Sequence, residues 1–114
     1  MPISDVTMDT IYQAMHGLAA RQRVVADNIA HIQTPNFQAG RVNFESSLRR
    51  AIGMGDPNAT SVDVGKSGDP SRQDGNNVNL DDETLSLTDT NLRYQTMVEA
   101  MNAKFRLLRT AIGN

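Results

Sequence analysis

The sequence predicts an all-α fold in which two long terminal helices form a coiled-coil-like pair, joined by an extended or loop-like centre that includes a short helix. At both ends of the 114-residue chain, apolar residues recur every three or four positions, which is the spacing of a helix with one apolar face. Between the ends, residues 53–79 contain five glycines and two prolines but few apolar side chains. We therefore expect an N-terminal helix over residues 1–34, a central segment over residues 35–79 and a C-terminal helix over residues 80–114, with both termini forming one domain.

The first long helix should begin at residue 4 or 5, because Ser4 and Asp5 can both accept hydrogen bonds from free backbone N–H groups. It should end at about residue 32 or 33, because Pro35 disfavours helical backbone in the residue before it. Gly17, in mid-helix, costs about 1 kcal/mol relative to alanine, and we attribute it to a neighbouring helix that passes close by. The apolar positions, which we call the N-terminal row, are Met8, Ile11, Met15, Leu18, Val25, Ile29 and Ile32, with the polar Gln22 among them.

The central segment should start as extended or turn-like chain over residues 35–42. Asn36 can adopt a left-handed turn conformation, and Phe37 is an isolated aromatic anchor. A short helix is expected over residues 43–51, because three apolar residues recur there at every fourth position: Phe44, Leu48 and Ile52. Residues 56–79 are predicted to be a flexible loop, with at most a brief strand around residues 62–64.

The second long helix should begin between residues 80 and 82. Acidic residues crowd its start and basic residues its end, which suits the helix dipole, and Gly113 follows its last apolar residue. The polar residues Gln22, Thr84 and Asn91 either set the register of the helix pair by hydrogen bonding or lie where the apolar faces meet solvent. The apolar positions of this helix, which we call the C-terminal row, are Leu80, Leu87, Tyr94, Val98, Met101, Phe105, Leu108 and Ile112.

The composition excludes several classes of protein. Lysine and arginine number 11 against 13 acidic residues, with no basic face, which argues against nucleic acid as a partner. The absence of cysteine excludes disulfides and cysteine-based zinc sites. No apolar run approaches the ~20 residues that span a bilayer, and no signal peptide is visible.

The candidates for chemistry are weak, so we predict that the chain is not an enzyme and needs no cofactor, metal or small-molecule substrate. Asp27 and His31 share one helix face, but His16 lies about four turns away, roughly 20 Å, so we interpret the pair as solvated. The oxygen-rich stretch 74–83 lacks the spacing of a calcium-binding EF-hand, and we interpret it as a turn followed by a helix N-cap. No nucleophile elbow or phosphate-binding loop is present.

Two helices bury little surface, so we expect other chains to cover the rows. The methionines of the rows, Met8, Met15 and Met101, with Met97 on a flank, are either ordinary core filling or adaptable contacts for several different neighbours.

Residues 26–38 carry a pattern that resembles the N-terminal signature of bacterial flagellar rod and hook proteins. In this family, a long helix ends in an Asn-Ile/Leu-Ala-Asn motif, followed two residues later by a threonine and then by a small turn residue and an aromatic residue. Two positions depart from it: His31 stands for the usual second Asn, and Asn36 for the usual Gly. Residues 74–81, 91–95 and 104–112 are similar to the proximal rod members, so the resemblance covers about residues 1–52 and 74–114. The matching motif residues are Asn28, Ile29, Ala30, Thr34, Pro35 and Phe37.

The resemblance implies a structural subunit of the flagellar basal body that polymerises helically through its terminal helices, so that the two rows are assembly surfaces. The resulting rod would cross the periplasm as a drive shaft that transmits torque. The implied partners are further copies of the chain, other rod proteins, the MS ring, a FliE-type adaptor and the flagellar type III export apparatus, which requires no cleaved signal peptide. The alternatives are a non-flagellar helical adaptor or secretion-system scaffold and, from another class, a small metal-dependent enzyme that uses Asp27 and His31.

Overall fold

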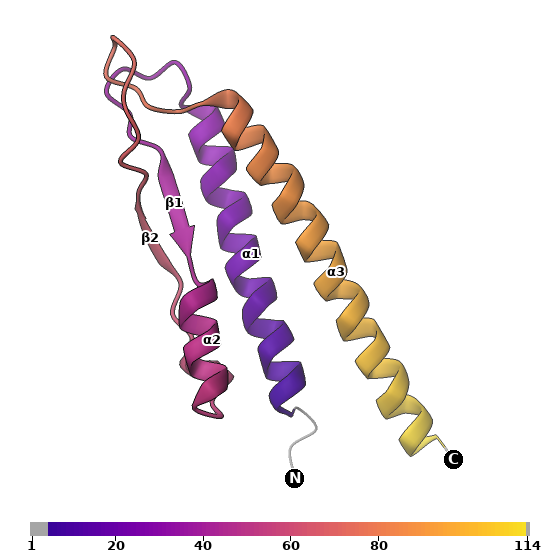
Figure 1. Cartoon of the computed structure of the whole chain (residues 1–114). Coiled ribbons are helices and arrows are strands. Elements are labelled where there is room, and N and C mark those ends of the chain that lie inside the picture. Colours follow the sequence, from indigo (N-terminus) through magenta and orange to yellow (C-terminus); the bar gives the residue numbers. More distant parts are fainter. Residues whose placement is uncertain (1–4, 114) are drawn as a thin grey trace.

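Two long helices run side by side along most of the molecule, and the chain between them returns along the other side of the first helix (Figure 1). The computed structural model describes residues 5–113. The first helix therefore lies in the middle of an elongated molecule with principal extents of 64, 26 and 14 Å. The elements in chain order are α1 (Val6–Ala30), β1 (Gly40–Asn43), α2 (Glu45–Gly53), the 3-10 turn η1 (Pro57–Ala59), β2 (Asp63–Lys66) and α3 (Leu80–Ile112).

The prediction of a mostly helical chain is confirmed, but the fold is not all-α. Strands β1 and β2 form a two-stranded antiparallel sheet in which Gly40 lies opposite Lys66 and Asn43 opposite Asp63. The brief strand that we allowed around residues 62–64 is present as β2. The expectation of a flexible loop over the rest of residues 56–79 is corrected, because this segment also holds η1 and a hydrogen-bonded turn before α3. Glycine and proline content reports local preference only, whereas this sheet joins segments that are distant in sequence.

The ends of α1 follow from local chemistry. Asp5 caps its start, where the carboxylate accepts a hydrogen bond of 2.9 Å from the backbone N–H of Met8. The alternative cap, Ser4, lies outside the described residues. The helix ends at Ala30, two residues earlier than expected, because the chain tightens into turns in which the N–H of Thr34 donates to the carbonyl of His31 at 3.0 Å. Asn36 has the expected left-handed conformation, with φ of 63°.

The core lies between α1, β1 and the start of α2. The ring of Phe44 packs directly over Gly17, where an added Cβ would lie 2.5 Å from the ring. Gly17 therefore makes room for an aromatic ring. The expectation that it makes room for a neighbouring helix is wrong. The buried cluster consists of Leu18, Ala20, Val42 and Phe44, with Val24, Leu48, Val62, Tyr94 and Met97 packed against it.

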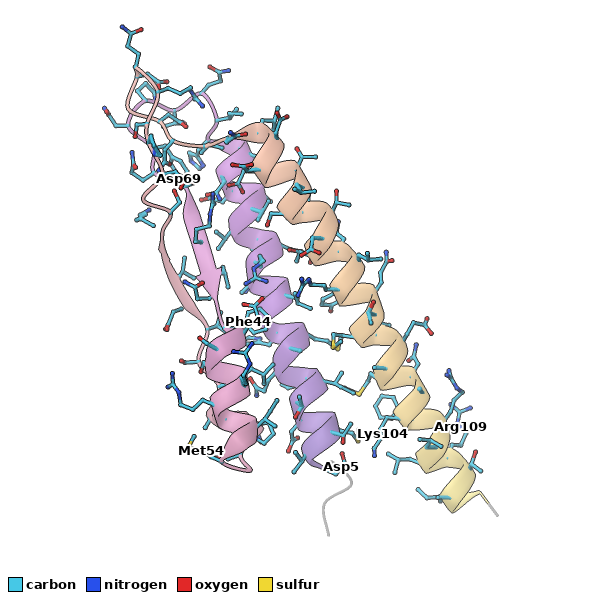
Figure 2. All side chains as sticks on the ribbon, in the orientation of Figure 1. Asp5, Phe44, Met54, Asp69, Lys104 and Arg109 are labelled. Atoms are coloured by element: carbon cyan, nitrogen blue, oxygen red, sulfur yellow. The ribbon has the colours of Figure 1, made fainter. Side chains whose placement is uncertain are left out.

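Helix α3 begins at Leu80, within the predicted range, and Asn79 caps it by accepting a hydrogen bond of 3.2 Å from the N–H of Asp82. Near the other end, the ammonium of Lys104 pairs at 2.7 Å with Asp5, the residue that precedes α1 (Figure 2). Residues 105–112 therefore continue past the start of α1 by about 12 Å, at 1.5 Å per residue. Among residues 5–113, no helix combines the length and apolar character needed to cross a membrane.

Candidate assembly interface and polar junction

The N-terminal row faces the inside of the molecule. Met8, Ile11, Leu18 and Val25 are buried, and the remaining apolar members, Met15, Ile29 and Ile32, are half-buried. Leu18 belongs to the buried cluster with Val42 and Phe44, against which Tyr94 and Met97 of α3 also pack. Much of this row is therefore covered within a single chain.

The C-terminal row is covered much less. Leu87, Tyr94, Val98, Met101 and Leu108 are half-buried, while Leu80, Phe105 and Ile112 are exposed, with Ile112 at 77%. Helix α1 is the main neighbour of α3, and Tyr94 and Met97 of α3 also pack against the buried cluster that contains Val42 and Phe44. Other apolar side chains on α3 remain open to solvent. Open apolar side chains at regular helical spacing favour contact with another chain.

One polar interruption of the two rows is shared by both helices. The side-chain amide of Gln22 on α1 donates a hydrogen bond to the side-chain oxygen of Asn91 on α3. Gln22 and Asn91 therefore form the hydrogen bond that the register-setting interpretation requires, whereas Thr84 is exposed. Beside Asn91, the hydroxyl of Thr90 is buried and has no hydrogen-bond partner within the described residues.

A second polar cluster, which we call the polar junction, lies where α1, β1 and α3 meet. Its centre is Asn28, whose side chain is 1% exposed. The Asn28 amide donates to the carbonyl of Gly40 and to a carboxylate oxygen of Glu83, both at 3.0 Å, and its oxygen accepts from the N–H of Gly40 at 2.8 Å. Asn28 thus satisfies both backbone groups of one residue of β1 while it reaches the first turn of α3.

The carboxylate of Glu83 is equally buried, at 1% exposure. Its other oxygen accepts a hydrogen bond of 2.8 Å from the guanidinium of Arg41, which also donates to the carbonyl of Gly40 and lies 3.5 Å from Asp69. A buried charge is stable only when it is paired and hydrogen-bonded, and both conditions hold here. The polar junction therefore connects α1, β1 and α3 through Asn28, Arg41 and Glu83, and each of these side chains is a hydrogen-bond partner of another.

The turn before α3 holds the loop that follows α1. The side-chain amide of Asn76 donates to the carbonyls of His31 and Thr34, both at 2.8 Å, and its oxygen accepts from the N–H of Val78. Asn77 in the same turn accepts from the N–H of Ala39 at 2.6 Å. The interpretation of residues 74–83 as a turn with a helix N-cap is confirmed, and the turn also fastens the end of α1.

The motif after α1 is built mainly around His31 and Phe37. Their rings stack with centroids 4.5 Å apart and planes 4° from parallel. The His31 ring also lies 3.4 Å from the Asp27 carboxylate, and the Lys66 ammonium lies 5.9 Å from the centre of the Phe37 ring. Of the other motif residues, Asn28 is buried, Ile29 is half-buried, and Ala30, Thr34 and Pro35 are exposed.

A third polar contact ties α1 to α2. The Arg21 guanidinium donates to both carboxylate oxygens of Glu45, at 2.6 and 2.7 Å, and to the carbonyl of Val42 at 2.8 Å, and it lies 5.0 Å from the centre of the Phe44 ring. The hydrogen bonds from Arg21 hold the pKa of the Glu45 carboxyl below its ordinary value. Arg21 and Arg41 line one hollow of about 370 Å³ between α1 and the sheet, and both are already paired with carboxylates.

The polar contacts of this region join α1 to β1, α2 and α3. Within residues 5–113, no three side chains of histidine, cysteine, aspartate or glutamate gather in a group that could hold a metal ion. Sequence reasoning singled out Asn28 through the motif but missed Glu83 and Arg41 as its partners. The only signal was the resemblance of residues 74–81 to a family pattern, which pointed to the right turn but not to the contacts that it makes.

Comparison with known proteins finds similarity along nearly the whole chain, although no family model matches it. The chain is 32% identical over 126 residues to the flagellar basal body rod protein FlgB of Bacillus subtilis (strain 168), covering 98% of this chain and 97% of that protein. The protein of the same name from Borrelia hermsii is 29% identical over 136 residues, with 98% and 99% covered. A third, from Yersinia enterocolitica, is 26% identical over 115 residues, with 82% and 84% covered. The similarity thus also includes the central residues 53–73, for which the sequence motifs showed no resemblance.

Proposed function

Because the chain belongs to the family of the flagellar basal body rod protein FlgB, we propose that it is a structural subunit of the proximal rod in the bacterial flagellar basal body. The observation that carries this proposal is the 32% identity to the Bacillus subtilis protein over almost the full length of both chains. The motif residues Asn28, Thr34 and Phe37 add support, because each takes part in the contacts at the end of α1. The same observations disfavour a non-flagellar adaptor, which would need neither the motif nor the turn that holds it.

The proposed mechanism is helical polymerisation through the terminal helices. The C-terminal row is the surface that supports it, because its apolar side chains are only partly covered by α1. Contacts between different surfaces of identical subunits do not close on themselves and generate a filament when the rotation between subunits does not close. Neighbouring chains that bury this row would stabilise α3 and join the subunits.

A rod that transmits torque needs subunits that resist internal sliding. The polar junction supports this role, because Asn28 and Glu83 fix α1 and α3 to each other and to β1. The Gln22–Asn91 hydrogen bond adds a second fixed point on α1, about 9 Å along the helix from Asn28. In this proposal the rigidity of packing takes the place that an active site has in an enzyme.

The proposed surroundings are those of a basal-body rod. The partners would be further copies of the chain, other rod proteins, the MS ring and a FliE-type adaptor, and the flagellar type III apparatus would export the chain.

Deleting the gene for this chain in the bacterium that encodes it tests the proposal. Basal bodies isolated from the deletion strain should lack rods, and expressing the chain in trans should restore rods and swimming. A deletion strain that still builds complete rods would contradict the proposal.

A further inference from the structure

Helix α3 carries two exposed surfaces near its opposite ends. The first, which we call the tip face, lies beyond the start of α1 and continues the C-terminal row. The second, which we call the outer stripe, lies near the start of α3, where Leu85 and Leu92 are 70% and 63% exposed. The tip face consists of Phe105, Leu108, Arg109 and Ile112, and the outer stripe of Asp82, Leu85, Asp89 and Leu92.

Both surfaces have the spacing of a helix contact. The outer stripe repeats an aspartate and a leucine at seven-residue intervals, so that its four side chains follow one line along the helix. A hollow lined by Asp82, Leu85, Ser86 and Asp89 lies along it. On the tip face, the apolar residues are three and four positions apart, which also places them on one side of α3.

The charges of the two surfaces are opposite. Arg109 lies within the tip face and Arg106 beside it, and neither forms an ion pair within residues 5–113. The outer stripe carries Asp82 and Asp89, of which Asp89 forms an exposed ion pair with Arg93 at 2.9 Å. These charges also suit the dipole of α3, so an experiment must separate a contact between chains from an effect within one helix.

The two surfaces cannot meet within one chain. Leu85 and Leu108 are separated by about 35 Å along a straight helix, at 1.5 Å per residue, and they face different directions around its axis. A tip face can therefore reach an outer stripe only on another molecule. Such a contact joins two different surfaces. In the resulting pair, one chain keeps a free tip face and the other keeps a free outer stripe, so that further copies can be added.

We propose that the tip face of one copy docks on the outer stripe of a second copy of this chain, with Arg106 and Arg109 opposite Asp82 and Asp89. The apolar side chains of the two surfaces supply the buried area, and the charges fix which end of α3 meets which. This inference rests on the proposed function, since it gives the polymerising subunit a specific contact.

The absence of native cysteine allows a direct test. A Leu85→Cys chain and a Leu108→Cys chain, distinguished by a size tag, are purified, mixed and mildly oxidised, and disulfide-linked dimers are counted. With the two chains in equal amounts, random pairing gives mixed dimers in twofold excess over dimers of either chain with itself, and the proposal expects an excess well above twofold. The matched control is Leu85→Cys mixed with Met54→Cys, because Met54 is exposed and lies at the same end of the molecule as the tip face (Figure 2). Ile112→Cys serves as a second tip variant in case Leu108→Cys folds poorly.

A charge-reversal arm separates docking from the dipole of α3. Arg106→Glu with Arg109→Glu in the tip chain should lower the mixed-dimer yield roughly fivefold or more, and Asp82→Lys with Asp89→Lys in the other chain should restore it. Mixed dimers no more frequent than in the control, or loss without restoration, would overturn the proposal. The cross-linking experiment uses purified chains, whereas the test of the proposed function examines rods from cells. A negative cross-linking result would therefore overturn this contact without overturning the proposed function.

Discussion

Asn28 and Glu83, which are 55 positions apart in the sequence, are joined by a buried hydrogen bond of 3.0 Å at the point where α1, β1 and α3 meet. Each side chain is 1% exposed, so neither can exchange its partner for water. The bond matters because it couples the end of one long helix to the start of the other.

Removing the positively charged partner of Glu83 should lower the free energy of unfolding more than removing the charge of Glu83 itself. Arg41→Met leaves a buried carboxylate without its cation, for which we expect a loss of about 3 kcal/mol in the free energy of unfolding. Glu83→Gln keeps the shape and most of the hydrogen bonding, so we expect a loss of about 1 kcal/mol. Urea unfolding of both variants and of the double variant measures this, and equal losses from the two single changes would contradict it.

Gly17→Ala should destabilise the chain although alanine favours helices. The added methyl group would lie 2.5 Å from the Phe44 ring, and such overpacking costs about 1–3 kcal/mol against a gain of about 1 kcal/mol in helix propensity. Thermal unfolding checks this, and Phe44→Leu in the same chain should recover part of the loss. Gly53→Ala is the matched control, because an added Cβ there meets nothing within 4 Å. A Gly17→Ala chain that is more stable than the parent would rule out the close contact.

Acid should lower the free energy of unfolding through the protonation of two carboxylates, Asp5 and Glu45. The pKa of Asp5 is lowered, chiefly by its hydrogen bond from Lys104, and the pKa of Glu45 is lowered, chiefly by its hydrogen bond from Arg21. A lowered pKa in the folded state means that the stabilisation is present at neutral pH and is lost as the pH falls below the ordinary values of 3.8 and 4.5. Urea unfolding at a series of pH values should show this fall, and Asp5→Asn with Glu45→Gln should flatten it. An equally steep fall in the double variant would show that other groups are responsible.

Gln22 and Asn91 should behave as a pair. Gln22→Leu leaves Asn91 without its partner between the helices, for which we expect a loss of about 1 kcal/mol. Replacing both by leucine should restore stability but weaken the preference for a single register, as polar pairs in coiled coils do. Urea unfolding gives the stability, and sedimentation gives the state of association. A double variant with the same loss as the sum of the single variants would show that the two residues act independently.

Leu108→Asp should block swimming by preventing assembly while export continues. Leu108 belongs to the C-terminal row, and a charge there opposes burial against another chain. Leu107→Asp is the matched control, because Leu107 is exposed and lies outside the row. Motility assays, with antibody detection of the chain in the medium and in basal bodies, measure both steps. Normal swimming of the Leu108→Asp strain would mean that the row is not an assembly surface.

Features set by nearby residues could be predicted from the sequence. The cap at Asp5, the turn at Asn36 and the start of α3 at Leu80 depend on a few neighbouring side chains, and the structure has all three. Contacts between distant segments could not be predicted. The pairing of Val42 with Val64 leaves little trace in either segment alone, because each strand has only four residues.

The same distinction applies to the candidate site. The apolar rows follow from helical spacing, but which of their members are covered depends on where the central segment returns along α1. Glu83 is indistinguishable in sequence from the acidic residues beside it that favour a helix start. Its burial depends on Asn28 and Arg41, which reach it from other parts of the chain.

Locating this chain in isolated basal bodies shows whether it is a subunit of the flagellar rod. Basal bodies are purified from the bacterium that encodes the chain and labelled with an antibody against it, and the label is located by electron microscopy. We expect label on the proximal part of the rod, and none on basal bodies from the deletion strain. Intact basal bodies that contain rods but no trace of the chain would contradict it.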